Sequence, residues 1–184
     1  MVELGRQILH MLFGAMLLFI ANYSGRESTI LLLGMVLFFG LVLVHFKLKG
    51  FKNPFIDFML EKFDRKEALP ARGGLTYAAG ALFLFAATDF TFAMGVTAIL
   101  AFGDGFATLV GISGKHFLPF NKKKTWAGAG AFVIAGIASS MFFLGLQNAI
   151  IYSVFLAAVE SIDFKVDDNI LIPFSASLLK SLLK

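Results

Sequence analysis

Cysteine is absent from the 184 residues, and charged side chains are scarce. Without cysteine there is no disulfide framework, no thiol nucleophile and no thiolate metal site. Charged residues make up 15% of the chain and hydrophobic residues 58%, whereas a soluble domain has about 25% charged residues. This balance excludes an ordinary soluble domain and indicates an integral membrane protein. The net charge of +4 is explained by loops beside the membrane, and no soluble module is evident, so no nucleic-acid partner is expected.

Apolar runs separated by polar segments predict seven transmembrane helices, since lipid admits only helices and closed barrels. The expected spans are 8–21, 28–44, 73–87, 90–102, 126–146, 149–162 and 170–183. Several are shorter than the roughly 17 residues usually needed to cross a bilayer. Residues 106–112 are apolar again, so a broken or re-entrant helix is expected around 103–105. No repeat or linker divides the chain, which predicts an all-α, polytopic membrane helical bundle forming one domain over residues 1–184.

The longest polar interval, residues 45–72, contains an amphipathic stretch. Its apolar residues recur at spacings of three and four, with charged residues between them: Phe51, Phe55, Phe58, Met59 and Phe63. This pattern predicts an amphipathic helix lying in the membrane interface.

Basic residues are distributed unequally over the segments that connect the spans. If the spans alternate in direction, the segments 1–7, 45–72, 103–125 and 163–169 share one side and contain thirteen of the sixteen Lys and Arg residues. The positive-inside rule then places these segments in the cytoplasm. The same arrangement brings two distant acidic groups, one at residue 104 and one at 160–168, to the cytoplasmic face.

The segment 103–128 combines a carboxylate, a glycine-punctuated turn and four lysines. Asp104 lies between two glycines at the end of an apolar run, where a carboxylate is unfavourable unless it is paired, hydrated or bound to a metal. Carboxylate oxygens suit Mg²⁺, and a turn at Gly114 can present backbone amides to an anion beside Lys115. Thr125 is a suitable N-cap for the next helix, whose N-terminus favours anions. The segment therefore predicts a site for a nucleotide polyphosphate with Mg²⁺, although it does not match the P-loop pattern.

A second acidic group follows about forty residues later. If the sixth helix continues one turn past Ile162, then Glu160, Asp163 and Asp167 share one face. A carboxylate here would hold a second metal or accept the proton of a substrate hydroxyl.

Each of these features also has a simpler interpretation. A lysine triplet beside a membrane span commonly anchors the topology or binds anionic lipid. Asp167 and its neighbours would serve as a turn and N-cap for the last helix. His10, one helical turn from Arg6, would be a hydrogen-bonding partner between helices, although ionisable residues within a membrane are default candidates for function.

Three groups of residues resemble the motifs of the phytol kinase and dolichol kinase family of CTP-dependent polyprenol kinases. The groups are Gly103-Asp104-x-x-Ala107; Gly111-x-x-Gly114-Lys115 to Pro119-Phe120-Asn121-x-Lys123-Lys124-Thr125-Trp126-x-Gly128; and Glu160 with Asp167-Asp168-Asn169-x-x-x-Pro173. Arg6-x-x-x-His10-x-x-x-Gly14 and Arg72-Gly73 also fit loosely. Two positions depart from the family pattern: Ala127 stands where the family commonly has Glu, and Gln7 replaces an expected Lys.

The resemblance implies transfer of the γ-phosphoryl group of CTP to the terminal hydroxyl of a membrane lipid alcohol, such as a polyprenol or dolichol, at the cytoplasmic face. The ligands of Mg²⁺ would be Asp104, Glu160 and Asp167. The catalytic residues would be Asp104, Glu160, Asp168 and His10. The nucleotide would be bound by Gly114, Lys115, Pro119, Asn121, Lys122, Lys123, Lys124 and Thr125.

The same residues are compatible with other functions. The family is related to CTP-dependent diacylglycerol kinases and, more distantly, to phosphatidate cytidylyltransferases, which form a CDP-lipid. A transporter fits less well, because the charges gather at one face and not at mid-span. A non-catalytic protein that binds anionic lipids through its lysines would show no dependence on a nucleotide.

Overall fold

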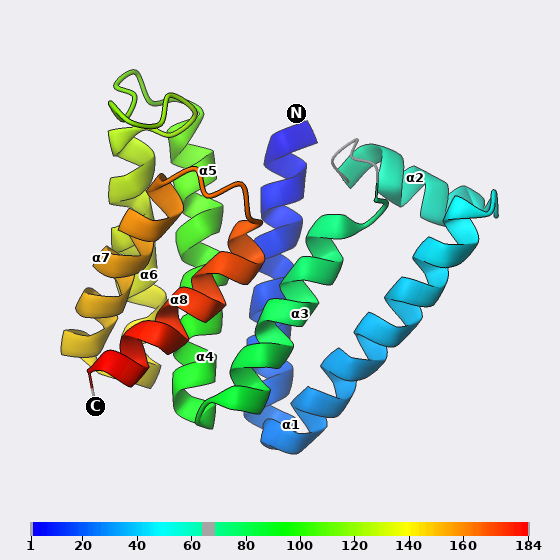
Figure 1. The fold of residues 1–184 in the computed structure, drawn as a ribbon, viewed down its shortest axis with the longest axis horizontal. Coiled ribbons are helices and arrows are strands. Elements are labelled where there is room, and N and C mark those ends of the chain that lie inside the picture. Colours follow the sequence, from blue (N-terminus) through cyan, green and yellow to red (C-terminus); the bar gives the residue numbers. More distant parts are fainter. Residues whose placement is uncertain (1, 64–68, 184) are drawn as a thin grey trace.

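The computed structural model describes residues 2–63 and 69–183, and helices make up most of these residues (Figure 1). The elements are α1 (Val2–Leu48), α2 (Pro54–Phe63), α3 (Arg72–Ala87), α4 (Phe90–Ala98), the π-helix η1 (Ile99–Asp104), α5 (Gly105–Gly111), α6 (Trp126–Leu144), α7 (Leu146–Ser161) and α8 (Asp168–Leu182). No strand occurs in the described ranges, where one isolated bridge joins Phe117 to Thr125. Three helices, Glu3–Leu48, Phe90–Gly111 and Trp126–Leu144, are long and apolar enough to cross a membrane. The predicted all-α membrane bundle is confirmed.

The long helix α1 consists of two halves that meet at Gly25. The φ angle of Gly25 is 80°, a left-handed conformation that glycine adopts without strain. Arg26 fixes the bend, because its guanidinium donates to the carbonyl oxygens of Phe85 at 2.7 Å and Ala86 at 2.9 Å. These carbonyls belong to the last turn of α3, where a cation is favourable. The two halves correspond to the first two expected spans and diverge from the bend (Figure 1).

The predicted amphipathic helix is present as α2. The side chains of Phe55 and Phe58 are exposed, as an interfacial helix requires. Its location in a membrane interface stays a prediction. Arg65 and Lys66, two of the thirteen basic residues assigned to one side, lie outside the described residues.

The expected break around residues 103–105 is wrong. The helix that begins at Phe90 continues to Gly111 through a π-helical turn, where the hydrogen bonds run from i to i+5. The two glycines here serve close packing. A Cβ at Gly105 would lie 2.5 Å from Cγ of Met11 in α1, and one at Gly103 would lie 3.2 Å from the ring of Phe132 in α6.

The boundaries of α6 and α7 also differ from the expected ones. Gly145, with a φ angle of 75°, separates the two helices, so α6 ends at Leu144 and α7 begins at Leu146. The expectation that the helix continues past Ile162 is wrong, because the backbone of Ile162 is extended and α7 ends at Ser161. The acidic residues at 160, 163 and 167 therefore do not share a helical face.

The last helix, α8, packs against α3 through a close backbone approach. Pro173 has no N–H group, so the carbonyl of Asn169 lacks its usual helical partner. Gly80 of α3 faces this carbonyl, and a Cβ at Gly80 would lie 2.0 Å from the oxygen. One turn further, the rings of Phe83 and Phe174 stack with centroids 3.9 Å apart. These contacts fix the position at which α8 begins.

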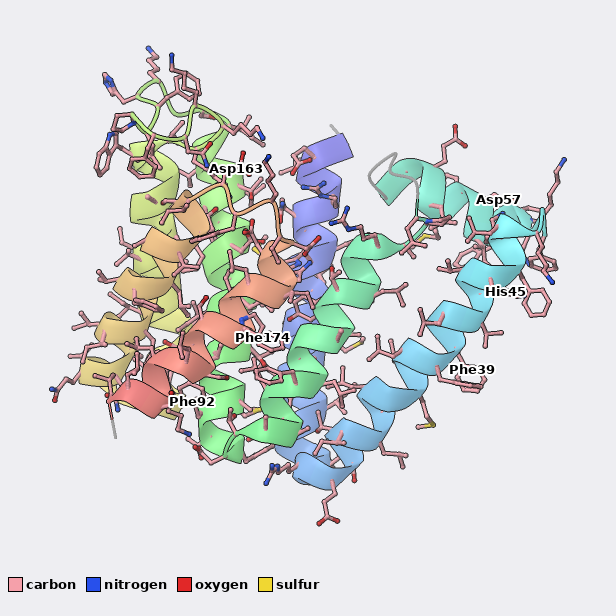
Figure 2. All side chains as sticks on the ribbon, in the orientation of Figure 1. Phe39, His45, Asp57, Phe92, Asp163 and Phe174 are labelled. Carbon is pink, nitrogen blue, oxygen red and sulfur yellow. The ribbon has the colours of Figure 1, made fainter. Side chains whose placement is uncertain are left out.

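The segments that connect the helices alternate between the two ends of the bundle. The segments 112–125 and 162–167 lie at the same end as the N-terminus, and the junction of α6 and α7 lies at the opposite end (Figure 1). Asp57 and Asp163 are near the first end, whereas Phe92 lies away from it (Figure 2). This alternation agrees with the arrangement from which the orientation was predicted. The number of membrane crossings and the cytoplasmic side stay predictions.

Candidate active site

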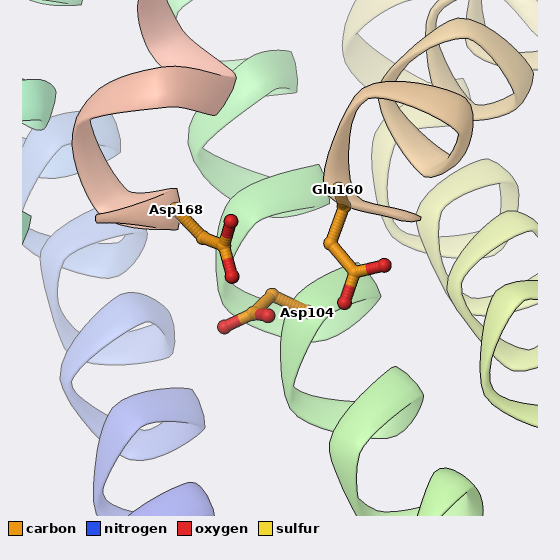
Figure 3. A group of neighbouring side chains, drawn as sticks. All are labelled: Asp104, Glu160 and Asp168. Carbon is orange, nitrogen blue, oxygen red and sulfur yellow. The ribbon is translucent and has the colours of Figure 1, made fainter. Parts of the chain in front are cut away.

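Three carboxylates from three different elements converge at one end of the bundle (Figure 3). Asp104 ends η1, Glu160 lies in the last turn of α7, and Asp168 is the first residue of α8. One oxygen from each lies within 4.8 Å of the other two. Glu160 is almost fully buried, with 3% of its surface exposed. We call this group the carboxylate trio.

Lys124 supplies the positive charge beside the trio. Its ammonium contacts the carboxylate of Glu160 and lies 3.5 Å from Oδ2 of Asp168. Burial alone would lower the pKa of Lys124, but the charges of Glu160, Asp168 and Asp104 outweigh burial and raise the pKa. Lys124 therefore stays protonated and offsets one of the three negative charges.

Burial and the neighbouring charges also shift the pKa of Asp168. Burial raises the pKa of its carboxyl group, Lys124 opposes the shift, and the charge of Asp104 adds to it. A carboxylate with a raised pKa binds a proton more readily than an exposed one. Asp168 is therefore suited to accept a proton.

Asp167, predicted as a metal ligand, has a different environment from Asp168. Its side chain caps α8 by accepting from the backbone N–H of Asn169 at 3.0 Å. The same oxygen accepts from the hydroxyl of Thr76 at 3.1 Å. Asp167 lies on the wall of the cavity described below, while Asp168 occupies the trio. The N-cap interpretation of Asp167 is confirmed.

His10 connects α1 to the turn that carries Asp104. Its Nε2 lies 3.1 Å from the carbonyl oxygen of Leu100 in η1 and 3.7 Å from Oδ2 of Asp104. A carbonyl only accepts, so Nε2 carries the hydrogen and donates it. The geometry thus favours a positioning role for His10, holding η1 in place, over the role of a base at Nε2.

A cavity of about 810 Å³ extends from the trio into the bundle. Its polar end contains, besides the trio, the side chains Glu3, Arg6, Gln7, His10, Arg72, Lys123, Lys124, Asp167 and Asn169. Its other end is apolar and lies between the two halves of α1 and α3; we call it the apolar chamber. The chamber is lined by Phe13, Leu17, Ile20, Leu33, Val36 and Leu75. From Phe13 to Ile20 it follows α1 for about 10 Å, at 1.5 Å per residue.

Four of the residues predicted to bind the nucleotide line this cavity: Gly114, Lys123, Lys124 and Thr125. The other four, Lys115, Pro119, Asn121 and Lys122, lie outside its lining. Lys115 and Lys122 are exposed. Thr125 caps α6 as predicted, since its hydroxyl accepts from the backbone N–H of Gly128 at 3.1 Å.

Asn121 holds the segment 112–125, which we call the lysine loop, against the end of α7. It is buried, and its amide nitrogen donates to the carbonyl of Ser161 at 2.9 Å. Its amide oxygen accepts from the backbone of Lys123 at 3.0 Å. Leu118, also buried, anchors the other arm of the loop. These contacts place Lys124 beside the trio. No local sequence motif predicts them.

Sequence reasoning did not single out Tyr77, which lies on the cavity wall next to His10. Nothing in its local sequence distinguishes it, because its position depends on the packing of three helices. Ala127 is exposed and lies outside the cavity lining. The absence of a Glu at this position therefore leaves the three carboxylates of the trio in place. Gln7, the second departure, is buried and lines the cavity.

Comparison with known proteins gives distant matches, two of them partial and one over nearly the whole chain. A probable chloroplastic phytol kinase of Triticum aestivum is 35% identical over 99 residues, which cover 44% of this chain and 33% of that protein. A probable phytol kinase of Glycine max is 34% identical over 99 residues, with 44% and 34% covered. A protein of Methanocaldococcus jannaschii described as uncharacterised is 27% identical over 186 residues, which cover 97% of this chain and 93% of that protein.

No family model and no solved structure matches the chain. The chain spans about a third of the length of the plant phytol kinases that it matches. Over that shared part, the chain is a distant relative of the phytol kinase family.

Proposed function

We propose that the protein is a Mg²⁺-dependent kinase that transfers the γ-phosphoryl group of CTP to the terminal hydroxyl of a membrane prenyl alcohol. One observation carries this proposal: a single cavity joins the carboxylate trio to an apolar chamber about 10 Å long. A site of this shape suits a substrate with a small polar head and a long apolar tail. The plant relatives are named as probable phytol kinases, and phytol is such an alcohol.

The trio has the donor set that Mg²⁺ requires. Its three ligand atoms are carboxylate oxygens, the hard donors that Mg²⁺ prefers. The three oxygens lie within 4.8 Å of one another and would together hold one ion. Three carboxylates and the ammonium of Lys124 carry a formal charge of −2 when all are ionised, opposite to that of the metal. When bound, the metal would neutralise charge on the phosphate oxygens.

The phosphates would be bound by the basic residues at the polar end. Lys123 and Lys124 come from the lysine loop, Arg6 comes from the second turn of α1, and Arg72 is the first residue of α3. Gly73 and Gly74 follow Arg72, and a Cβ at either would meet no atom of the described residues within 4 Å; both glycines line the cavity. Backbone N–H groups at a helix start favour a phosphate.

The prenyl alcohol would lie with its tail in the apolar chamber and its hydroxyl at the trio. In the reaction, the hydroxyl oxygen bonds to the γ-phosphorus and the bond from that phosphorus to the β-phosphate oxygen breaks. CDP leaves, and Asp168 accepts the hydroxyl proton. The chain contributes mainly positioning and charge, which supply most of the catalysis in phosphoryl transfer.

Labelled nucleotide tests this proposal directly. Purified protein in nanodiscs is incubated with a prenyl alcohol or, separately, with a lipid phosphate such as phosphatidate, together with Mg²⁺ and CTP labelled at either the α or the γ position. We expect only the γ label in the lipid product. The α label in the lipid would mean that the protein is a cytidylyltransferase, and no label in either case would contradict both activities.

A further inference from the structure

Three buried residues line the inner end of the apolar chamber. They are Leu17 in the first half of α1, Leu33 in its second half and Ala78 in α3. Their exposed fractions are 6%, 4% and 4%, whereas Phe13, which lines the chamber one turn nearer the trio, is 52% exposed. We call Leu17, Leu33 and Ala78 the chamber floor.

Beyond the chamber floor, side chains fill the space between the helices. One helical turn nearer the bend of α1, the same faces carry Ala21, Thr29 and Ala81. All three are fully buried, and none of them lines the cavity. The bend itself is held in place, because Arg26 donates to the carbonyl oxygens of the last turn of α3. The two halves of α1 meet at this bend and diverge from it (Figure 1). The cavity lining thus stops on all three segments, as at the closed end of a pocket.

The rise of α1 gives the depth of the chamber floor. His10 lies 3.7 Å from the carboxylate of Asp104 in the trio. From His10 the cavity lining runs along α1 to Leu17 and ends at Ile20, which is a rise of about 10–15 Å. An extended chain gains about 1.2 Å per bond, so an isoprenoid unit of four chain bonds spans about 5 Å. The floor is therefore roughly two to three isoprenoid units away from the trio.

We propose that the chamber floor sets the length of the prenyl tail, and that the acceptor is a short prenyl alcohol of two or three isoprenoid units. This inference rests on the proposed function. The tail enters from lipid, which is as apolar as the chamber, so packing and not removal from water decides between tails. A tail that ends at the floor keeps its contacts, whereas a longer one has to bend back or leave the chamber. Leu17, Leu33 and Ala78 are accordingly specificity-determining residues.

Two substitutions at the chamber floor should change the preferred length in opposite directions. Leu33→Ala removes side-chain atoms and deepens the chamber, so the KM for geranylgeraniol relative to farnesol should fall about tenfold, as for a small change in an apolar pocket. Ala78→Val adds atoms from another helix and should move the preference to geraniol. Leu156→Ala is the matched control, because Leu156 in α7 is also fully buried but lies outside the cavity lining. It should lower the Tm and leave the order of the alcohols unchanged.

A binding measurement keeps this test separate from catalysis. The Tm of the metal-free protein in detergent is measured without nucleotide, with geraniol, farnesol or geranylgeraniol at one concentration. Wild type and Leu156→Ala should gain most from farnesol, Leu33→Ala from geranylgeraniol and Ala78→Val from geraniol. A wild-type gain that keeps rising with chain length, or one order of alcohols in wild type and in both floor variants, would overturn the inference. Failure of wild type to transfer phosphate would instead overturn the proposed function and leave this binding test in force.

Discussion

Replacing Asp104 by Asn removes one charge from the trio while keeping the size of the side chain. Each pair of carboxylates lies within 4.8 Å, and at an effective dielectric constant of 20 their repulsion is about 3.5 kcal/mol. Asp104 takes part in two such pairs, and the attraction of Lys124 offsets part of their sum. We expect Asp104→Asn to stabilise the metal-free protein by about 1–3 kcal/mol.

The same substitution should remove the response to Mg²⁺. Wild type is expected to gain Tm on addition of Mg²⁺, because the metal binds the folded protein and not the unfolded chain. Asp104→Asn should show little gain, and its kcat/KM should fall by at least about 100-fold, as when one preorganised charge is lost from an active site. Differential scanning fluorimetry with and without Mg²⁺ measures the first effect, and γ-labelled CTP measures the second.

Asp163→Asn is the matched control for this test. Asp163 is an exposed carboxylate that pairs with Lys123 on the surface and is not a member of the trio. Its substitution should leave the Mg²⁺ response intact. A lower Tm for metal-free Asp104→Asn, together with a retained Mg²⁺ response, would refute the assignment of the trio as a metal site.

Three further effects follow from the same contacts. Lys124→Met should lower the free energy of unfolding by about 3–5 kcal/mol, since it leaves the buried carboxylate of Glu160 unpaired; chemical denaturation in detergent measures this. Gly80→Ala should lower the Tm, because its Cβ would lie 2.0 Å from a carbonyl oxygen of α8, and activity should fall as α8 shifts. Lowering the pH toward 5 should weaken Mg²⁺ binding and raise the metal-free Tm, because Asp168, whose pKa is raised, binds a proton more readily when folded than when unfolded; Mg²⁺ titration at several pH values checks this.

Each of these effects has a control in the chain. Lys122→Met removes an exposed lysine of the same loop and should change the free energy of unfolding by less than about 0.5 kcal/mol. Gly130→Ala adds a Cβ to α6 with no atom within 4 Å and should not lower the Tm. If Gly80→Ala behaves as Gly130→Ala does, the close approach of α8 to α3 is not needed. A Mg²⁺ affinity that does not change between pH 7 and 5 would contradict the assignment of Asp168.

Hydropathy predicted the helices well, because a helix in contact with lipid needs a long run of apolar residues. The bend at Gly25 and the start of α4 at Phe90 fall where the runs predict them. The π-helical turn of η1 was not predictable, since Gly103 and Gly105 suggest a break when read locally. Their role becomes visible only once α1 and α6 pack against them.

The sequence predicted those site residues whose charge is energetically unfavourable in apolar surroundings. Asp104 and Glu160 stood out as carboxylates in or beside apolar runs. The choice between Asp167 and Asp168 depends on where α8 begins, because the N-cap side chain turns back onto its own helix and the next one faces the trio. That starting point is fixed by the contact between Gly80 and α8, which joins distant parts of the chain.

The path of the lysine loop also could not be predicted from the local sequence. Four lysines were assigned to the phosphates from their charge and from the family resemblance, but Lys115 and Lys122 are exposed outside the cavity lining. The path of the loop follows from the burial of Leu118 and from the hydrogen bond of Asn121 to Ser161. Neither contact follows from the charge pattern.

Transfer of label from γ-labelled CTP to a prenyl alcohol tests the central claim most directly. Wild-type protein in nanodiscs, with Mg²⁺ and a panel of prenyl alcohols and diacylglycerol, should place the γ label in the lipid of a prenyl alcohol, and chelation of Mg²⁺ should abolish the transfer. CTP should support the transfer better than ATP. Absence of γ label from every lipid, or its appearance without any divalent cation, would contradict the account.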